Sequence, residues 1–155
     1  MEQYLTWNSE QALGHLVALA VAYLLALPIG WNREREERSA GVRTFPLVAM
    51  AACGFVMIAI GVLGAGSEQH SRIIEGLMTG IGFIGGGAIL KQGDRAKGTA
   101  TAASLWATGA IGAAVGYGQL DIAVILSLVT VLTLVVMAPL RKVVQERAPL
   151  DREEV

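Results

Sequence analysis

Five apolar stretches, separated by short polar segments, make up most of the chain. They cover residues 12–31, 46–64, 73–90, 100–117 and 122–140, so each is 18 to 20 residues long. A helix of about 20 apolar residues is what a hydrocarbon core of roughly 30 Å requires. The stretches lack the polar alternation every 3.6 residues that a helix on a soluble surface shows. The pattern predicts an all-α integral membrane bundle of five transmembrane helices.

Lysine and arginine predict the orientation of this bundle. The segments before, between and after the five stretches contain 0, 4, 1, 3, 0 and 4 basic residues in chain order. Because basic residues concentrate in cytoplasmic segments, we expect the N-terminus outside and the C-terminus in the cytoplasm. Residues 1–145 would form a transmembrane domain in the cell inner (cytoplasmic) membrane. Residues 146–155 would form a short cytoplasmic tail, without a C-terminal soluble domain.

Composition agrees with this assignment and excludes several function classes. Hydrophobic residues make up 54% of the chain and charged residues only 16%, against roughly 25% charged residues in soluble domains. The net charge of −1 gives no basic field for nucleic acid. Cys53 is the single cysteine, so the chain has no internal disulfide. No catalytic serine–histidine–acid set or P-loop is present, and we expect neither an enzyme nor a cofactor.

The stretch TGIGFIGGGAIL, residues 79–90, contains a literal G-x-G-x-x-G. A dinucleotide-binding turn needs a preceding strand and an acidic residue about 20 positions later. Here the glycines lie inside a predicted span, and Ala100 and Thr101 stand at the distant position. Small residues four apart instead let two helix backbones approach closely. The residues expected at this helix contact are Gly76, Gly80, Gly82, Gly86, Trp106, Gly109 and Gly112.

A second interpretation of the same glycines stays open. Glycine weakens a helix by up to about 1 kcal/mol relative to alanine, and residues 85–87 are three glycines in a row. A helix break there would expose backbone carbonyls at membrane depth, as at the ion sites of transporters.

Three segments together resemble the MgtC/SapB family of bacterial membrane proteins. They are PIGWNREREERSAGVRTFPLVA, TGIGFIGGGAIL and GTATAASLWATGAIGAAVGYG, and the resemblance extends from Ala26 to about Gly118. It implies a five-helix inner-membrane protein. It also implies a link to magnesium limitation, to virulence through survival in macrophages, and to inhibition of the rotary ATP synthase.

The ionisable residues of the predicted outer level form one candidate site. Glu75 is the only acid inside an apolar stretch, and His15 lies near the start of the first stretch. An acid within a membrane span is a functional candidate. Together with Glu68 and Asp121 these residues could sense protons or bind an oxygen-liking cation such as magnesium. Alternatively, Glu75 is a carboxylate favourably placed at a helix N-terminus, and His15 is merely a polar residue.

The predicted cytoplasmic face is the denser candidate. An arginine-rich segment there faces the hydroxyl-bearing start of the fourth helix. Such a surface could bind an anion, a lipid headgroup or an acidic loop of a partner. The alternative is topological anchoring with local pairs such as Glu34 and Arg38, four residues apart. The candidate residues are Asn32, Arg33, Arg35, Arg43, Thr44, Asp94, Thr99, Thr101 and Ser104. We also expect Thr44 to cap the second helix and Thr99 or Thr101 to cap the fourth.

Two functions follow as hypotheses. In the first, the chain is an MgtC-like regulator that contacts another membrane protein, such as the ATP synthase. In the second, it is a small transporter of a solute or an ion (Mg²⁺ or proton-coupled) that uses Glu75 and the glycine-rich third helix. A lipid-binding structural protein is a third, weaker option. Membrane lipids and further copies of the chain are the other expected partners.

Overall fold

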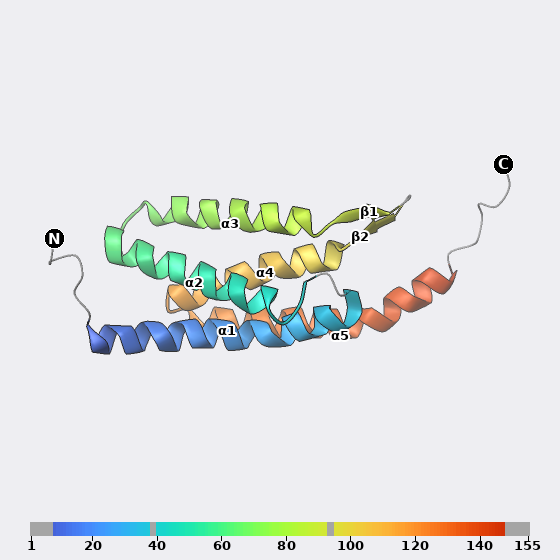
Figure 1. The fold of residues 1–155 in the computed structure, drawn as a ribbon, viewed down its shortest axis with the longest axis horizontal. Coiled ribbons are helices and arrows are strands. Elements are labelled where there is room, and N and C mark those ends of the chain that lie inside the picture. The colour runs from blue at the N-terminus through green and yellow to red at the C-terminus, as the bar shows by residue number, and fades with distance from the viewer. Residues whose placement is uncertain (1–7, 38–39, 93–94, 148–155) are drawn as a thin grey trace.

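A computed structural model describes residues 8–37, 40–92 and 95–147. The described residues form five helices that run along the long axis of the molecule (Figure 1). The helices are α1 (Ser9–Glu37), α2 (Thr44–Leu63), α3 (His70–Gly87), α4 (Thr99–Gly116) and α5 (Leu120–Arg147). Consecutive helices alternate in direction, so the α2–α3 and α4–α5 turns share one end of the bundle. The all-helical fold is the one predicted from the sequence.

The outside of the bundle is strongly apolar. Large hydrophobic side chains are exposed on every helix, and Phe83 of α3 and Val62 of α2 are exposed by 86% and 77%. By length and composition, α1, α2 and α5 are able to cross a membrane. The helices α3 and α4 have 18 residues each. His70, Arg72 and Glu75 lower the hydropathy of α3, and glycine and short polar residues lower that of α4. The protein is therefore a membrane protein, whereas five crossings and their orientation stay predictions.

Helix α4 lies at the centre and packs against the other four helices. Small residues allow α4 to occupy this central position. A Cβ atom on Gly112 would collide with the carbonyl oxygen of Ala49 in α2, and one on Gly116 would lie 2.9 Å from the carbonyl oxygen of Cys53. Close backbone approach of this kind is what small residues permit at helix contacts in membranes. The backbones of α2 and α4 therefore touch without intervening side chains.

Helix α3 lies at the side of the bundle, against α4 and α2. Its contact with α4 depends on two positions: the side chain of Ile81 packs directly on Gly109, and Gly85 faces the backbone of Ala102. The helix is continuous through Gly85 and Gly86 and ends at Gly87, where the Ala88 N–H bonds to the Gly85 carbonyl at 3.0 Å. The glycine triplet therefore forms the last turn of α3, and the helix break considered above does not occur there.

A short β-hairpin, which the sequence analysis did not predict, joins α3 to α4. Strands β1 (Leu90–Gln92) and β2 (Arg95–Lys97) pair antiparallel, with Leu90 opposite Lys97. The chain enters α4 at Gly98, whose φ of +87° is a left-handed conformation that favours glycine. Gly98 also lies directly against the Ala88 carbonyl, which leaves no room for a Cβ atom.

The predicted threonine caps are wrong. The residue before α2 is Arg43, in a helical conformation without a side-chain capping bond, and the N–H groups of Thr44 and Phe45 bond to the Gly41 carbonyl at 3.0 and 3.2 Å. The residue before α4 is Gly98, also without a side-chain cap, and its carbonyl accepts from the Ala102 N–H at 2.8 Å. At α2 the Gly41 carbonyl thus accepts the first N–H groups of the helix, whereas at α4 the bond from Ala102 to Gly98 is the first ordinary hydrogen bond of the helix.

Candidate functional site

A buried arginine marks the end of the bundle that carries the α1–α2 connection and the hairpin. Arg33 of α1 is only 3% exposed. Its Nε and Nη2 groups donate to the Asn32 Oδ1 atom at 3.2 and 2.7 Å. One turn earlier on the same side of α1 lies Ile29, in a core cluster that also contains Phe45 and Leu105. Arg33 therefore closes the apolar core at this end with a guanidinium group.

The chain folds back tightly between α1 and α2. The Glu34 carboxylate accepts a hydrogen bond from the Val42 N–H at 2.8 Å. Gly41 lies directly against the Glu34 side chain, and a Cβ atom on Gly30 would lie 2.9 Å from the Gly41 carbonyl oxygen. Because neither glycine position has room for a side chain, the connection is held close to α1. Its position relative to Arg33 is therefore fixed by local packing.

The start of α4 contributes hydroxyl groups that are buried. Thr101 is fully buried and Ser104 is 3% exposed. The Ser104 hydroxyl donates to the Ala100 carbonyl at 2.6 Å, and the Thr108 hydroxyl donates to the Ser104 carbonyl at 2.8 Å. Hydroxyls that bond to the preceding turn of their own helix are satisfied without a partner from another helix. Ser104 and Thr108 can therefore lie in the helix interface at little cost.

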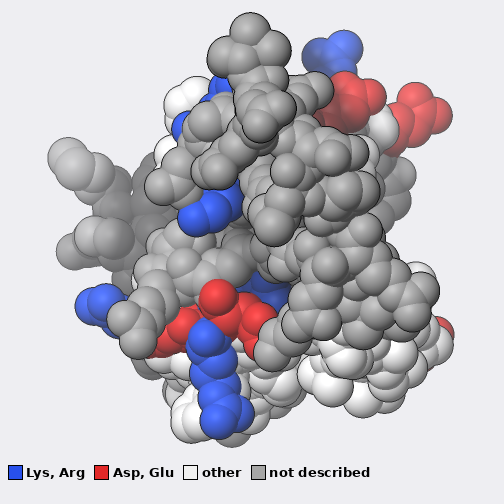
Figure 2. All heavy atoms as spheres, turned by 90° about the vertical axis from the view of Figure 1, so that its right-hand side faces the viewer, with Lys and Arg blue, Asp and Glu red and all other residues white. Residues whose placement is uncertain are grey.

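The remaining predicted residues of this face lie at its surface. Arg35, Arg43 and Thr99 are exposed, whereas Asn32 and Thr44 are half-buried. Asp94 lies outside the described residues. Figure 2 shows this end of the molecule, with basic and acidic side chains next to one another. Of the predicted residues, Arg33, Thr101 and Ser104 are thus buried, whereas Arg35, Arg43 and Thr99 are exposed.

The second predicted site is not assembled within the chain. His15 and Glu75 are both exposed. They lie on α1 and α3, at opposite sides of the bundle, with α2 and α4 between these helices (Figure 1). Among the described residues, no three His, Cys, Asp or Glu side chains lie close enough to hold a metal ion. That Glu75 or His15 individually binds a proton or an ion stays a prediction.

His70, the first residue of α3, connects three helices. Its Nε2 atom lies 2.8 Å from the Gly64 carbonyl oxygen, and its Nδ1 atom lies 3.1 Å from the Tyr117 hydroxyl. Because a carbonyl oxygen only accepts, Nε2 carries the proton of this bond. The two rings also meet edge to face at 5.5 Å. His70 therefore joins the ends of α2 and α4 to the start of α3, and no sequence pattern indicated this pairing.

The predicted packing glycines fall into two groups. Gly109 and Gly112 lie at tight contacts of α4, with Ile81 and Ala49 respectively. A Cβ atom on the four α3 glycines would meet nothing within 4 Å; these are Gly76, Gly80, Gly82 and Gly86. Trp106 is 49% exposed. The packing prediction for the four α3 glycines is therefore wrong within the single chain, because α3 contacts α4 through Ile81 and Gly85 instead.

Comparison with known proteins identifies the family. The model of the MgtC family matches residues 19–143. The chain is 37% identical to the protein SrpB of Synechococcus elongatus, over 90% of this chain and 84% of SrpB. It is 40% identical to the protein MgtC of Brucella abortus, over 86% of this chain and 54% of that protein.

The protein MgtC of Salmonella typhimurium is 36% identical over 68% of this chain, which spans 44% of its length. The chain thus spans about half the length of the proteins named MgtC. No solved structure matches it. The match to the family model covers most of the chain, including the buried Arg33 and the whole of α4, and the chain belongs to the MgtC family.

Proposed function

We propose that the chain is a five-span protein of the cytoplasmic membrane that regulates another membrane protein by direct contact. The resemblance to the MgtC/SapB family suggests the rotary ATP synthase as the partner, and magnesium limitation or virulence as the setting. The observation that carries the proposal is the charged end of the bundle, where Arg33 is 3% exposed, whereas Arg35 and Arg43 are exposed.

A contact surface needs side chains that are held in place. Burying a guanidinium group is costly unless hydrogen bonds compensate for the lost water, and Arg33 donates two such bonds to Asn32. The hydrogen bond from the Val42 N–H to Glu34, at 2.8 Å, fixes the connection beside it. Arg35 is exposed on the same turn of α1. Exposed charges on a rigid frame favour association with an oppositely charged partner surface, so an acidic cytoplasmic loop is the chemistry that this end fits.

The test uses proteoliposomes that contain purified rotary ATP synthase with or without the full chain. We expect the chain to lower ATP-driven proton pumping, measured with a pH-sensitive dye. Arg35→Glu should restore pumping because it reverses an exposed charge, whereas Arg35→Lys, which keeps the charge, should still inhibit. Pumping that is the same with and without the unsubstituted chain contradicts the ATP synthase as the partner.

The transporter hypothesis is tested in liposomes that contain the chain alone. A regulator that acts by contact should show no flux of Mg²⁺ or protons above that of empty liposomes. Flux that is present in the unsubstituted chain and lost in Glu75→Gln would replace the proposal by a transport function. The two assays therefore separate the two hypotheses without knowledge of the natural host.

A further inference from the structure

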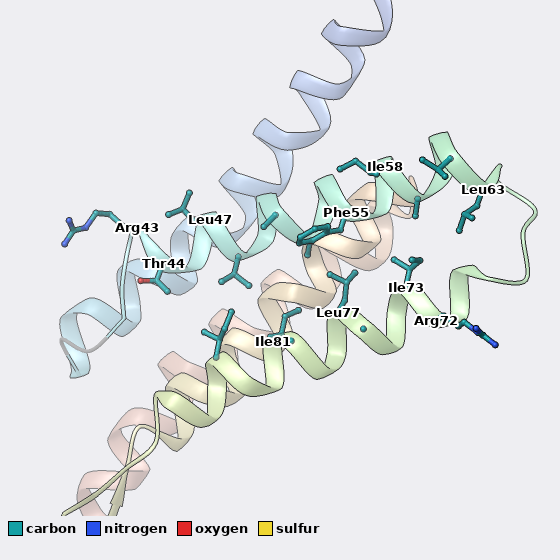
Figure 3. A pocket seen from close by; sticks show the side chains of 18 residues that line it. Arg43, Thr44, Leu47, Phe55, Ile58, Leu63, Arg72, Ile73, Leu77 and Ile81 are labelled. Atoms are coloured by element: carbon teal, nitrogen blue, oxygen red, sulfur yellow. The ribbon is translucent and has the colours of Figure 1, made fainter. Parts of the chain in front are cut away.

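A long apolar groove lies between α2 and α3, with a volume of about 1200 Å³ (Figure 3). This volume exceeds the roughly 300–1,000 Å³ of ordinary small-molecule sites. Leu47, Phe55 and Ile58 line the groove from α2, and Ile73 and Leu77 line it from α3. The α2 side chains are more than half exposed, Ile58 by 64%. The groove is therefore open to the surroundings along its length.

Two glycines of α3 make the groove wide. Gly76 and Gly80 belong to its lining, and a Cβ atom on either would meet nothing within 4 Å. The contact of α3 with α4, through Ile81 and Gly85, does not use these two positions. Their missing side chains therefore leave space on the α2 side of α3, and no contact within the chain fills it.

The two ends of the groove carry positive charge. Arg43 and Thr44 lie at one end, where α2 begins, and Arg72 lies at the other end, in the first turn of α3 (Figure 3). Arg43 directly precedes the first turn of α2. Because α2 and α3 are antiparallel, the dipoles of the two helices oppose each other at each end, and the positive charge there comes from the guanidinium group. Guanidinium groups bind phosphate well, and the Thr44 hydroxyl adds a donor at the first end. Both ends thus suit an anion, while the space between them suits hydrocarbon.

The distance between the ends fits a bilayer. Helix α2 has 20 residues, which at 1.5 Å per residue span about 30 Å. This is the thickness of a typical hydrocarbon core. A phospholipid in each leaflet places its phosphate at one boundary of that core and its acyl chains inside it. Basic pockets between transmembrane helices are known to hold lipid headgroups.

We infer that the α2–α3 groove binds phospholipid, with one molecule from each leaflet. One phosphate lies at Arg43 and Thr44, the other at Arg72, and the acyl chains occupy the apolar space beside Gly76 and Gly80. The competing occupant is a second copy of the chain, whose α1 carries acidic residues near both ends, Glu10 and Glu36. The oligomeric state of the groove-filling variants separates this occupant from phospholipid. Every phospholipid of either leaflet supplies the phosphate.

The experiment compares two glycine substitutions on the same helix. Gly80→Leu fills the groove, whereas Gly82→Leu points into open space outside the groove lining. The full chain is purified in detergent, stripped of lipid and mixed with phosphatidylglycerol, and bound lipid is counted by native mass spectrometry. We expect the unsubstituted chain and Gly82→Leu to bind lipid equally, and Gly80→Leu to bind about tenfold more weakly.

Charge substitutions test the phosphate positions. Arg43→Gln and Arg72→Gln should each weaken lipid binding about tenfold, because each removes charge-assisted hydrogen bonds. Lys97→Gln removes an exposed basic residue outside the groove lining and should leave lipid binding unchanged. Circular dichroism and gel filtration check that each variant is folded. Ala51→Leu, which fills the groove from α2, replaces Gly80→Leu if the latter does not fold.

Three results would overturn the inference. The first is lipid binding by a folded groove-filling variant, Gly80→Leu or Ala51→Leu, that equals that of Gly82→Leu. The second is a dimer that the groove-filling variant dissociates while lipid binding is unchanged, since the groove would then be an interface between copies. The third is unchanged lipid binding in both Arg43→Gln and Arg72→Gln. None of these outcomes depends on the ATP synthase assay.

Discussion

Helices α3 and α4 have the same length and both contain several glycines, yet they occupy opposite environments. Each has 18 residues. Helix α4 packs against all four other helices, and Gly109, Gly112 and Gly116 leave no room for a side chain. Helix α3 lies at the side, and Gly80 and Gly82 face open space. A small-residue pattern thus gives the capacity for close approach, but it does not determine which helix approaches.

The polar residues of the two helices explain the difference. Those of α4 are short hydroxyls, and Ser104 and Thr108 bond to carbonyls of their own helix at 2.6 and 2.8 Å. Such residues can be buried. Helix α3 carries Arg72 and Glu75, both exposed. Because a charge is costly to bury without a partner, these residues keep the start of α3 at the edge of the bundle. The glycines that follow line a groove or an open surface.

Among substitutions of the small residues in these helices, one at the contact of α2 with α4 should have the largest effect on stability. Gly112→Leu should destabilise the protein by about 3 kcal/mol or more, because its side chain must displace the Ala49 backbone. The measurement is thermal unfolding in detergent, followed by circular dichroism. Gly86→Leu on α3, where a Cβ atom has no neighbour, is the matched control and should unfold close to the unsubstituted temperature. Equal unfolding temperatures for the two variants would contradict the packing of α4.

The next largest effect concerns the joint between the hairpin and α4. Gly98→Ala should cost about 1–2 kcal/mol from the left-handed backbone alone, and more from contact with the Ala88 carbonyl. The same unfolding assay measures it. Gly14→Ala, at a helical glycine without neighbours, is the control. A Gly98→Ala variant as stable as Gly14→Ala would show that the φ of +87° is not required.

A smaller effect is expected at the opposite joint, where α3 begins and α4 ends. Tyr117→Phe removes the hydroxyl that lies 3.1 Å from His70 Nδ1 and keeps the ring contact. The loss of one hydrogen bond should cost about 1 kcal/mol. Tyr23→Phe on α1, at an exposed tyrosine, controls for the loss of a hydroxyl. If both variants unfold at the same temperature, the contact between His70 and Tyr117 contributes nothing to stability.

The smallest effect is expected on the open face of α3. Gly82→Ala should leave the free energy of unfolding unchanged or raise it by up to about 1 kcal/mol, since alanine is the better helix former. Unfolding in detergent measures this change, with Gly116→Ala as the destabilised counterpart, because its Cβ atom would lie 2.9 Å from the Cys53 carbonyl oxygen. A loss of stability in Gly82→Ala would mean that the open face of α3 contacts another molecule under the conditions of the assay.

Much of the fold could be predicted from local sequence. The stretch 46–64 corresponds to α2 at Thr44–Leu63, and 100–117 corresponds to α4 at Thr99–Gly116. The hairpin was missed because its strands have only three residues each. The Gly–Asp pair between the strands was the available signal. The threonine caps were wrong because the helices start at the threonines themselves, after Arg43 in α2 and after Gly98 in α4. The predicted capping residues therefore lie inside the first turn and not before it.

The candidate site could be predicted only in part. The sequence grouped Arg33 with Arg35 and Arg43 as one charged run. The structure separates them, since Arg33 is 3% exposed and the other two are exposed. Arg33 follows Ile29 by four residues, so the two lie on the same side of a helix. This spacing was a weak signal in the sequence that the Arg33 side chain is buried. Its burial depends on α2 and α4, which pack on α1 from elsewhere in the chain.

The sequence by itself determined that this protein is helical and belongs in a membrane, because the length and hydropathy of a helix are properties of consecutive residues. It also determined which residues are small enough for close contact. Only the tertiary structure decided which of these residues are in contact. A glycine is buried or open according to a distant side chain or backbone, as Ile81 covers Gly109 and Ala49 meets Gly112. The groove between α2 and α3 also depends on contacts between distant residues. Helix α3 makes its tight contacts, at Ile81 and Gly85, with α4 and not with α2.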